Sequence, residues 1–326
     1  MKRYVLLLLV VAFMFFSCHK KDSTQTDQID YSTVKVPAFN ADSAYTYVAA
    51  QCAFGPRVPE SKAHDKCAQY LVSFMRQYAD TVIEQPFTTK LYNGKVVKGV
   101  NIIASFNTAT TDRIVLASHW DSRLWADNDK DETKQKTPVI AANDGASGVG
   151  VLMEIARQLK TQKPKTGVDL IFFDMEDQGC PMWDKTEIED ESDWCLGAQY
   201  WSRNTHVPFY QAKGGILLDM VGYKNLRFTK EEVSRTYAPT MTDKVWKIAK
   251  DRGYGNVFVN EETLGIIDDH NHVNKNANIP MIDLVQNDAT GSFFPYWHTT
   301  KDDMSQISKK SLKIVGEVCL VAIYTN

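Results

Sequence analysis

The sequence lacks the features of three common classes of protein. Its longest unbroken apolar run, residues 4–16, is too short to span a bilayer comfortably, which argues against a membrane-spanning helix. Acidic residues outnumber basic ones, 40 to 37, so nothing indicates a nucleic-acid-binding surface. No CxxC motif occurs, which argues against a zinc site built from thiolates. Internal repeats and low-complexity segments are also absent.

The N-terminus has the pattern of an export signal. Lys2 and Arg3 precede the apolar run and Ser17-Cys18 follows it, so residues 1–17 are predicted to be a signal peptide. A small residue before cysteine resembles a bacterial lipoprotein processing site. We therefore expect a lipid anchor at Cys18 and an exported protein of the bacterial periplasm or cell envelope, which meets the membrane only through that anchor. Secretion without a lipid is the alternative.

Residues 19–34 are polar and poor in aromatic side chains, as in a tether, which leaves residues 35–326 for the folded domain. Apart from Cys18, the cysteines are odd in number for an oxidising compartment. Cys52 with Cys67, and Cys180 with Cys195, could each close a short loop, and the spacing leaves the pairing open. Cys319 lies in an apolar stretch and is expected to be a buried thiol.

Apolar runs alternate with segments of helical periodicity, which predicts one α/β domain with a mixed, mostly parallel central sheet flanked by helices. At 326 residues and 44% hydrophobic content the chain can bury a large core. The strands are expected at 86–89, 96–106, 114–118, 168–173, 214–220 and 279–285, and the helices at 41–52, 61–78, 149–159, 196–202, 240–252 and 309–324. A turn at Asn93-Gly94 should join the first two strands, and residues 124–137 are expected to form a surface loop.

Acidic residues and histidines follow several of the predicted strands, at the point where each apolar run ends. Because the carboxyl ends of parallel strands meet at one edge of a sheet, these side chains should converge. An isolated Glu-Asp pair is usually a solvated junction and one histidine is usually a core or surface residue, but the repetition here favours a site. The candidates are His119, Asp121, Asp144, Glu176, Asp177, Asp219, Asp268, Asp269, His270 and His298.

So many carboxylates cannot share a crevice fully ionised without a cation or shared protons. Carboxylate and imidazole ligands without thiolates suit a catalytic zinc with an open coordination position. The residue types therefore predict a catalytic zinc site at the edge of the sheet.

The ordered motifs resemble the zinc exopeptidase fold and, more closely, the zinc-dependent glutaminyl-peptide cyclotransferases, also called glutaminyl cyclases. The resemblance runs from Ala41 to the C-terminus. Aminopeptidases share most of these motifs, so they are more specific for the fold than for the activity. The motifs are His119-Trp120-Asp121-Ser122, Asn143-Asp144-Gly145-Ala146-Ser147, Phe173-Asp174-Met175-Glu176-Asp177, Leu218-Asp219, Asp268-Asp269-His270 and Trp297-His298-Thr299.

The resemblance implies one zinc per chain, held by Asp144, Asp177 and His298. It implies that His119 lies in the second coordination shell. Animal cyclases carry glutamate where this chain has Asp177, so this ligand is one methylene shorter and the zinc or the backbone must shift to meet it.

The resemblance also implies catalytic roles within residues 35–326. Glu176 would be the general acid/base, and Asp268 would be a hydrogen-bonding partner near it, linked to Asp219. The expected substrates are peptides or proteins with N-terminal glutamine, which would be cyclised to pyroglutamate with release of ammonia.

Three aromatic residues, Trp297, Trp183 and Phe294, are expected to line an apolar pocket for the glutamine methylenes, with core packing as the alternative. Asp269 and His270 are expected to be structural partners rather than ligands. The acidic run 184–193 is interpreted as a solvated loop, with attraction of a substrate amine or a calcium ion as the alternative.

The main competing hypothesis is a secreted aminopeptidase of the same fold with two zincs. In it, His119 and Asp219 hold a second metal, Asp144 bridges the two, and Glu176 activates water instead of an amine. The tryptophans favour the cyclase. A peptide-binding lipoprotein with an inactive site is disfavoured, because no expected ligand or base is missing.

Overall fold

The computed structural model describes residues 29–185, 191–288 and 290–326, and Tyr31–Asn326 form one compact unit. The predicted signal peptide, Cys18, most of the tether and the middle of the acidic run 184–193 lie outside the described residues. Tyr31 is buried against the core, so the compact unit begins four residues before position 35. No helix in the described ranges is long and apolar enough to cross a membrane.

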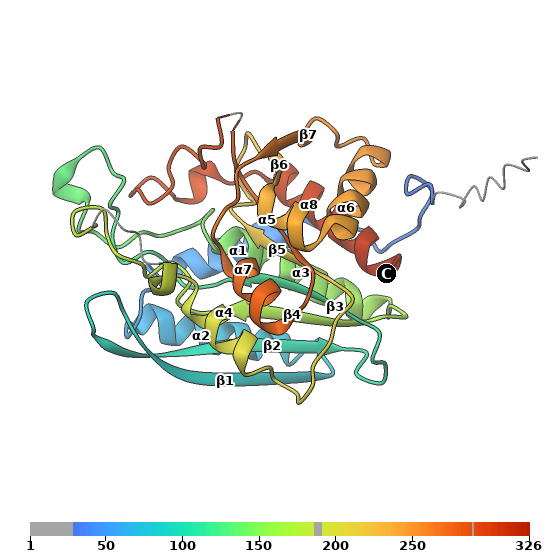
Figure 1. Cartoon of the computed structure of the whole chain (residues 1–326), viewed down its shortest axis with the longest axis horizontal. Helices are drawn as coiled ribbons and strands as arrows, with labels where there is room; N and C mark the ends of the chain where they lie inside the picture. The colour runs from blue at the N-terminus through green and yellow to red at the C-terminus, as the bar shows by residue number, and fades with distance from the viewer. Residues whose placement is uncertain (1–28, 186–190, 289) are drawn as a thin grey trace, which may run out of the picture. The chain divides into compact units, whose positions relative to one another are not determined.

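The centre of the molecule is a six-stranded sheet with the strand order β1-β2-β4-β3-β5-β8 (Figure 1). Strands β3, β4, β5 and β8 run parallel, β2 is antiparallel to β4, and β1 pairs antiparallel with β2. The prediction of a mixed, mostly parallel sheet is confirmed. The strands are β1 Thr81–Lys90, β2 Val96–Phe106, β3 Arg113–His119, β4 Gly167–Phe173, β5 Gly215–Asp219 and β8 Met281–Val285.

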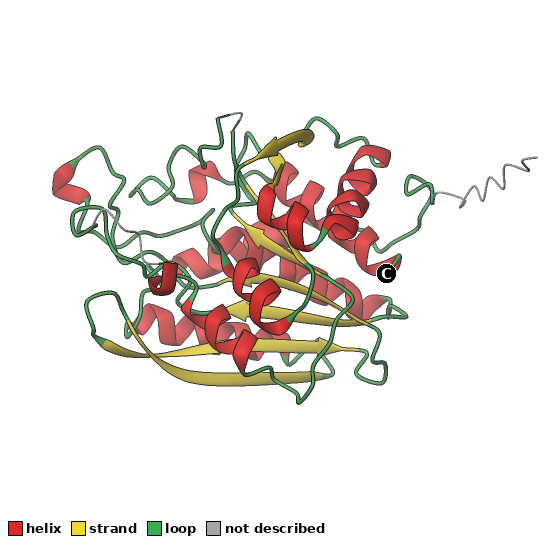
Figure 2. Cartoon of the chain, in the orientation of Figure 1, coloured by secondary structure: helices red, strands yellow, loops and turns green. Residues whose placement is uncertain are grey.

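Helices cover both faces of this sheet (Figure 2). One core cluster joins one sheet face to α1 Ala41–Ala53, α2 Lys62–Met75, α3 Ala146–Thr161, α6 Pro239–Asp251 and α8 Lys309–Tyr324. The other joins the opposite face to α4 Leu196–Arg203 and to the segment after α7 Asp269–His272, a π-helical turn Val273–Ala277. Strands β3, β4, β5 and β8 are buried along their whole length, which is why they read as continuous apolar runs in the sequence.

The structure differs from the expectation at strand β1 and in a second, smaller sheet. Strand β1 begins at Thr81 rather than at residue 86, because it is an edge strand whose first residues are exposed or half-buried and carry no apolar run. A second, two-stranded sheet of β6 Phe228–Glu231 and β7 Phe258–Thr263 was not predicted, because both strands are short and largely polar. Helix α5, Glu232–Tyr237, follows β6 directly. Short 3-10 turns lie at Glu132–Lys134, Glu191–Asp193 and Met304–Gln306.

Two glycines have backbone conformations that matter for the fold, and the first confirms the predicted turn at Asn93-Gly94. Gly94 has a φ of 79° in the turn between β1 and β2, a conformation that favours glycine. Gly145 has a φ of 84° just before α3, and a Cβ there would lie 2.7 Å from His119 Cε1. Glycine therefore lets the start of α3 approach the end of β3, and this brings Asp144 beside His119.

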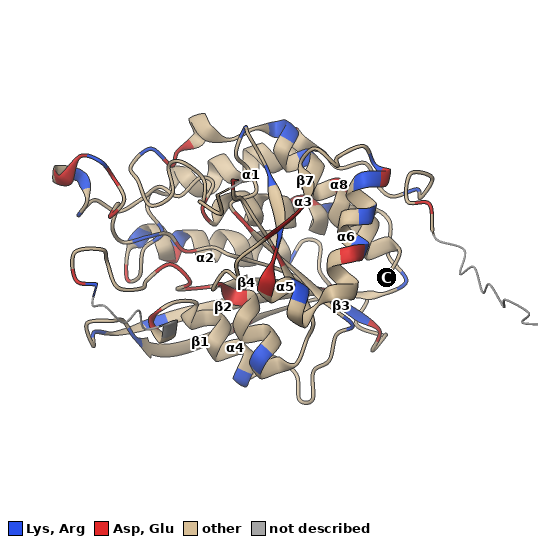
Figure 3. Cartoon of the chain, turned by 45° about the horizontal axis from the view of Figure 1, so that its top comes forward, with Lys and Arg blue, Asp and Glu red and all other residues tan. Residues whose placement is uncertain are grey.

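The five cysteines in the described residues are all free, so neither short loop is closed by a disulfide. Cys319 is a buried thiol in α8, as expected. In Figure 3, lysine and arginine positions lie mainly on outer helices and loops, whereas acidic positions also reach the centre, beyond the carboxyl ends of the strands. That central acidic region is the candidate site.

Candidate metal centre

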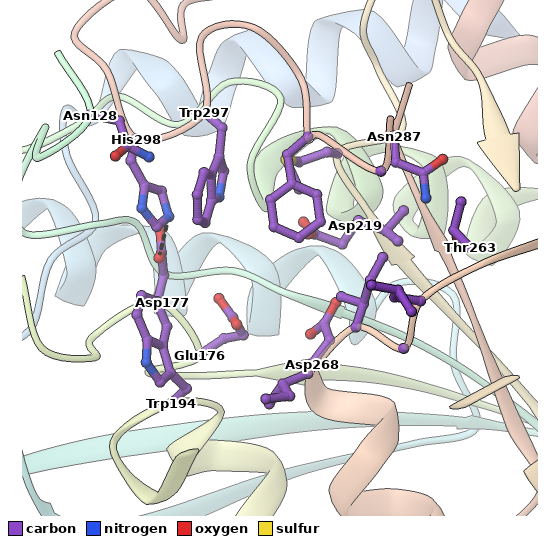
Figure 4. A pocket seen from close by; sticks show the side chains of 18 of the residues that line it. Asn128, Glu176, Asp177, Trp194, Asp219, Thr263, Asp268, Asn287, Trp297 and His298 are labelled. Atoms are coloured by element: carbon purple, nitrogen blue, oxygen red, sulfur yellow. Dashed lines mark ion pairs between the residues drawn. The ribbon is translucent and has the colours of Figure 1, made fainter. Parts of the chain in front are cut away.

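Asp144, Asp177 and His298 come together at the carboxyl edge of the sheet (Figure 4). Asp144 precedes α3, Asp177 follows β4, and His298 lies in the loop between β8 and α8. All three are buried, and each offers a ligand atom within 4.8 Å of the others. His298 Nε2 is 2.8 Å from Asp177 Oδ1 and 3.7 Å from Asp144 Oδ2. The structure thus assembles the three residues proposed as zinc ligands.

Asp177 has the features of an anion that requires a cation. Both of its carboxylate oxygens are buried, and neither has a hydrogen-bond partner among the described residues. His298 Nε2 lies 2.8 Å from Asp177 Oδ1, but the two groups are not aligned as a hydrogen bond. This is the arrangement expected where the lone pairs of both atoms point at one shared position. Burial raises the pKa of Asp177 to about 6, with His298 opposing and Asp144 adding to the increase. The donor set of two carboxylates and one imidazole therefore fits a zinc ion.

A second group shares Asp144 with the first. His119 Nε2 lies 3.0 Å from Asp144 Oδ1 and 3.2 Å from Asp219 Oδ1, and both contacts are hydrogen bonds. Burial opposes protonation of His119, but Asp121, Asp144 and Asp219 together raise its pKa well above the ordinary value. These three residues, His119, Asp144 and Asp219, are also close enough to hold an ion. Unlike Asp177 in the first group, Asp144 and Asp219 each have a hydrogen-bond partner, His119 Nε2, without an ion, whereas His119 Nδ1 has none among the described residues.

Glu176 lies beside the first group and lines a cavity of about 900 Å³. Its Oε1 accepts a weak hydrogen bond from Cys195 Sγ at 3.5 Å. A carboxylate oxygen of Asp268 lies within 4.8 Å of a Glu176 carboxylate oxygen and of Cys195 Sγ. Burial raises the pKa of Glu176 well above its usual range; His119 opposes this, and the carboxylates of Asp177 and Asp268 add to it. A buried carboxyl group with a raised pKa, facing a cavity, is a candidate general acid/base.

Asp268 caps the short helix α7 by accepting from the Asp269 backbone N–H. Its relation to Asp219 is charge repulsion, which adds to the effect of burial and of Asp144 in raising the pKa of Asp219 to about 8. Asp269 and His270 are fully buried behind Asp268. His270 lies 3.4 Å from Glu231 and 3.9 Å from Asp283, away from the first group.

Two further buried carboxylates hold the backbone of the site. Asp121 accepts from the backbone N–H groups of Glu176 and Asp177 at 3.1 and 3.2 Å. Asp302 accepts from the N–H groups of Asn143 and Asp144 at 2.8 and 3.0 Å. Asp121, a candidate ligand in the sequence, therefore fixes the turn that carries the ligands.

Backbone conformation around the site is unusual for residues with side chains. Met175 precedes Glu176, Met220 follows Asp219, and these two residues and His298 have φ values of 57°, 49° and 53°. This left-handed region costs a non-glycine residue on the order of 1–2 kcal/mol. Such conformations collect at functional sites, where the surrounding structure enforces them.

Arg123 and Asp127 support the centre, and neither was identified from the sequence. Arg123 Nη1 donates to the backbone oxygens of Asp177 and Gly179 at 3.1 and 2.8 Å, and Nη2 donates to Asp127 Oδ2 at 2.6 Å. Asp127 Oδ1 lies 3.5 Å from His298 Nδ1. The interpretation of residues 124–137 as a surface excursion was therefore wrong at its start, since Asp127 is buried. The Arg-Asp spacing of four residues directly after the His119 motif was the available signal.

Two tryptophans flank His298. The ring of Trp194 lies parallel to the imidazole with centroids 6.0 Å apart, and the ring of Trp297 lies 3.9 Å away. Both line the cavity, so the structure places Trp297 in the pocket, as expected, together with Trp194, which was not predicted there. The guanidinium of Arg123 lies over Trp194 at 4.6 Å and fixes it.

The other two predicted pocket residues lie elsewhere. Trp183 is 40% exposed, packs edge-on against Trp125 and is not part of the cavity wall. Phe294 is buried against Tyr223 and Tyr296, and its neighbour Phe293 lines the cavity instead. Neighbouring residues in an extended segment face opposite ways, and composition alone does not show which of them faces the cavity.

The chain matches peptidase family M28 over residues 101–323. The chain belongs to this family. Within it, the chain is 48% identical to glutaminyl cyclase of Bacteroides thetaiotaomicron, whose crystal structure was solved with bound N-acetylhistamine; the match covers 90% of this chain and 100% of that one, with a TM-score of 0.88. It is equally similar, at 48% identity and a TM-score of 0.87, to a leucine aminopeptidase precursor from the same organism, over 90% of this chain and 99% of that one.

The chain spans 22% of the length of one curated relative that it matches and 37% of the length of another. One is aminopeptidase YwaD of Bacillus subtilis (strain 168), 26% identical over 192 residues, which are 56% of this chain. The predicted resemblance to the zinc exopeptidase fold is confirmed, and bacterial glutaminyl cyclases are among the similar M28 structures. The M28 relatives carry both cyclase and aminopeptidase names, so the choice between the two reactions has to come from the site.

Proposed function

We propose that this M28 enzyme cyclises the N-terminal glutamine of peptides and proteins to pyroglutamate and releases ammonia. One observation carries the proposal: Asp177 alone among the metal-type carboxylates of the two groups has both oxygens without a hydrogen-bond partner, whereas Asp144 and Asp219 are satisfied by His119. Of these two groups, only the first leaves a buried carboxylate without a partner, at the position where a cation would bind. A single-zinc centre is what the resemblance to the cyclases implies.

Asp144, Asp177 and His298 would hold the zinc, which when bound supplies a Lewis acid for the γ-carboxamide oxygen of glutamine. Trp194 and Trp297 provide apolar walls for the side-chain methylenes. The attacking amine and the amide carbon belong to the same residue, so the site has mainly to hold that residue curled and in register.

Glu176 performs both proton transfers in this proposal. It accepts a proton from the α-amine as the nitrogen–carbon bond of the ring forms, and it returns that proton to the amide nitrogen as the carbon–nitrogen bond of the carboxamide breaks. The leaving group is then ammonia rather than an amide anion, and no water is consumed. Asp268, which has a carboxylate oxygen within 4.8 Å of one of Glu176, would accept a hydrogen bond from the substrate amine.

The test compares two peptides that differ only in having glutamine or leucine at the first position. The enzyme should release ammonia from the glutamine peptide, leaving a product lighter by one ammonia and blocked at its amino terminus, and should leave the leucine peptide intact. Glu176→Gln should lower the rate by roughly 10²- to 10⁴-fold while the metal stays bound. Release of free leucine without pyroglutamate formation would refute the cyclase proposal.

An aminopeptidase with two metals is the second candidate, because His119, Asp144 and Asp219 form a second group of metal-type ligands next to the first. In that reaction Glu176 would take a proton from water. The leucine peptide in the same assay distinguishes the two.

We also propose that the chain is exported and anchored through a lipid on Cys18, which rests on the N-terminal sequence pattern alone. Cys18→Ser should move the protein from the membrane fraction to the soluble fraction. Unchanged fractionation would exclude Cys18 as the anchor.

A further inference from the structure

The cavity that contains Glu176 is larger than its reaction requires. About 900 Å³ lies near the upper end of the range found for drug-sized ligands, well above what one glutamine side chain fills. Figure 4 shows its two ends: Trp194, Trp297 and His298 lie at the metal end, whereas Thr263 and Asn287 lie at the far end. Any substrate with its first residue at the metal end leaves the far end open for its second and later residues.

A four-residue loop, Leu264–Ile267, forms part of the far wall. It joins the end of β7 to Asp268, so one short segment connects the far end to the catalytic centre. Leu264 is 83% exposed and Ile267 is 43% exposed, although both line the cavity. Single exposed aliphatic residues are ordinary, but two in one loop that lines the cavity of the catalytic centre form an apolar surface that a ligand can cover.

Part of the backbone of this loop, at Gly265 and Ile267, is also available to bind a ligand. Ile266 is tied down: its N–H donates to Glu231 Oε2 at 3.3 Å, and its carbonyl accepts from Asn271 Nδ2 at 3.4 Å. Beyond the pairing of β6 with β7, the backbone groups of Gly265 and Ile267 make no hydrogen bond with any described residue. Backbone N–H and C=O groups without partners in a loop that lines the cavity are the groups that a peptide backbone needs.

The charges around the far end limit what can bind there. Glu232 and Glu262 line the cavity with Arg235, and Arg235 Nη1 is paired with Glu262 Oε2 at 3.1 Å. Two carboxylates therefore face one guanidinium that is already engaged. An acidic side chain would meet repulsion at this end, whereas an apolar side chain would cover Leu264 and Ile267.

We propose that the Leu264–Ile267 loop binds the second to fourth residues of the substrate. The preferred substrate class is then a peptide chain of at least about four residues with an apolar, non-acidic residue after the N-terminal glutamine. Free glutamine and dipeptides would be poor substrates. The inference rests on the proposed function, because the substrate's first residue must occupy the metal end.

The experiment measures ammonia release from three glutamine substrates: Gln-Ala amide, Gln-Leu-Ala-Ala amide and Gln-Asp-Ala-Ala amide. In the wild-type enzyme kcat/KM should be roughly tenfold higher for the leucine tetrapeptide than for the dipeptide, since burying about one aliphatic side chain has an effect of this size. The aspartate tetrapeptide should gain nothing. N-methylation of the amide between residues two and three should lower the gain by removing a backbone donor.

The variants are Leu264→Ser and Ile267→Ser, at side chains exposed enough that folding does not depend on them. Each should lower the tetrapeptide-to-dipeptide ratio of kcat/KM by several-fold, and the double variant should bring it close to one. Phe209→Ser is the matched control, because Phe209 is 98% exposed, lies outside the cavity wall and undergoes the same kind of change. It should keep the wild-type ratio.

Failure of this inference is separable from failure of the proposed function. Equal kcat/KM values for all three glutamine substrates, or an unchanged ratio in the double variant, would overturn the peptide-binding role while ammonia release continued. If no substrate released ammonia, the cyclase proposal would fail, and direct calorimetric binding of the two tetrapeptides to Glu176→Gln protein would still test the loop. Equal affinity for the leucine and aspartate peptides would then refute it.

Discussion

Two buried carboxylates, one near each end of strand β4, differ in their hydrogen-bond partners. Asp169, near its amino end, accepts from Arg113 Nε and Nη2 at 2.6 and 2.7 Å, from Ser105 at 2.6 Å and from Tyr210 at 2.5 Å. Asp177, beyond its carboxyl end, has no hydrogen-bond partner for either oxygen among the described residues. The chain supplies its own cation to the first carboxylate and leaves the second for a ligand. Full satisfaction of Asp169 marks a structural polar cluster, whereas the unpartnered oxygens of Asp177 line the cavity and mark a binding site. Asp269 and Asp283 also have unpartnered oxygens, but they do not line the cavity.

Removing His298 should have the largest effect on the carboxyl end. His298→Ala is expected to lose zinc and all measurable activity, because the centre is left with two carboxylates. Metal analysis of the purified protein and the ammonia assay provide the readout. His119→Ala is the comparison, since the carboxylates of its group have a hydrogen-bond partner without an ion, and it should retain one zinc per chain. Two zincs in the wild type, with one lost in His119→Ala, would favour the aminopeptidase.

Breaking the amino-terminal cluster should affect folding rather than metal content. Arg113→Ala leaves Asp169 buried without its cation and is expected to destabilise the protein by about 3–5 kcal/mol. Urea titration measures the loss, and the folded fraction should still bind zinc. Arg76→Ala serves as the control, because Arg76 pairs with Glu84 on the surface at 2.8 Å and should contribute less than about 1 kcal/mol. Equal effects of the two changes would contradict the assignment.

Variants of Arg123 test whether the metal centre beyond the carboxyl end of β4 depends on supporting residues. Arg123→Lys keeps the charge but cannot hold Asp127, Asp177 and Trp194 together, so His298 loses its orientation. Zinc affinity should fall by roughly 10- to 100-fold. Competition with a chelating dye measures this, and Asp127→Asn should have a similar effect. An unchanged affinity in both variants would show that the ligands hold their geometry without this pair.

The smallest expected effect concerns pH. His64 Nε2 lies 2.8 Å from Asp174 Oδ1, and its ring stacks on Trp120. Burial opposes protonation of His64, but Asp174 outweighs it, so the pKa of His64 is raised above 6.5. This stabilisation is fully present below pH 6.5 and is lost as the pH rises through the raised value. The Tm difference between wild type and His64→Gln should therefore shrink between pH 6 and pH 9, and a constant difference would exclude it.

The sequence predicted the parts of the molecule in which a local pattern has one physical meaning. Continuous apolar runs showed the buried strands, and ligand-type residues near their ends predicted a candidate site at that edge of the sheet. The resemblance to the glutaminyl cyclases then selected Asp144, Asp177 and His298 from the candidates. Sequence patterns failed to predict roles that depend on packing between residues far apart in the chain. Nothing in the local sequence distinguishes Trp194 from Trp183, or Phe293 from Phe294, as the residue facing the cavity. Arg123 was missed because its partners, Asp177 and Gly179, lie more than fifty residues away.

The left-handed residues around the centre set a limit for engineering. Met175, Met220 and His298 hold conformations that glycine adopts without strain, but the two methionine side chains are buried in core clusters. Glycine there would relieve on the order of 1–2 kcal/mol of strain and lose about 2–5 kcal/mol of packing. Glycine would also give the unfolded chain more freedom and loosen the segments that carry Glu176 and Asp219. The strain is therefore retained together with the packing that enforces it, and heat resistance should be improved at positions of this chain other than these two.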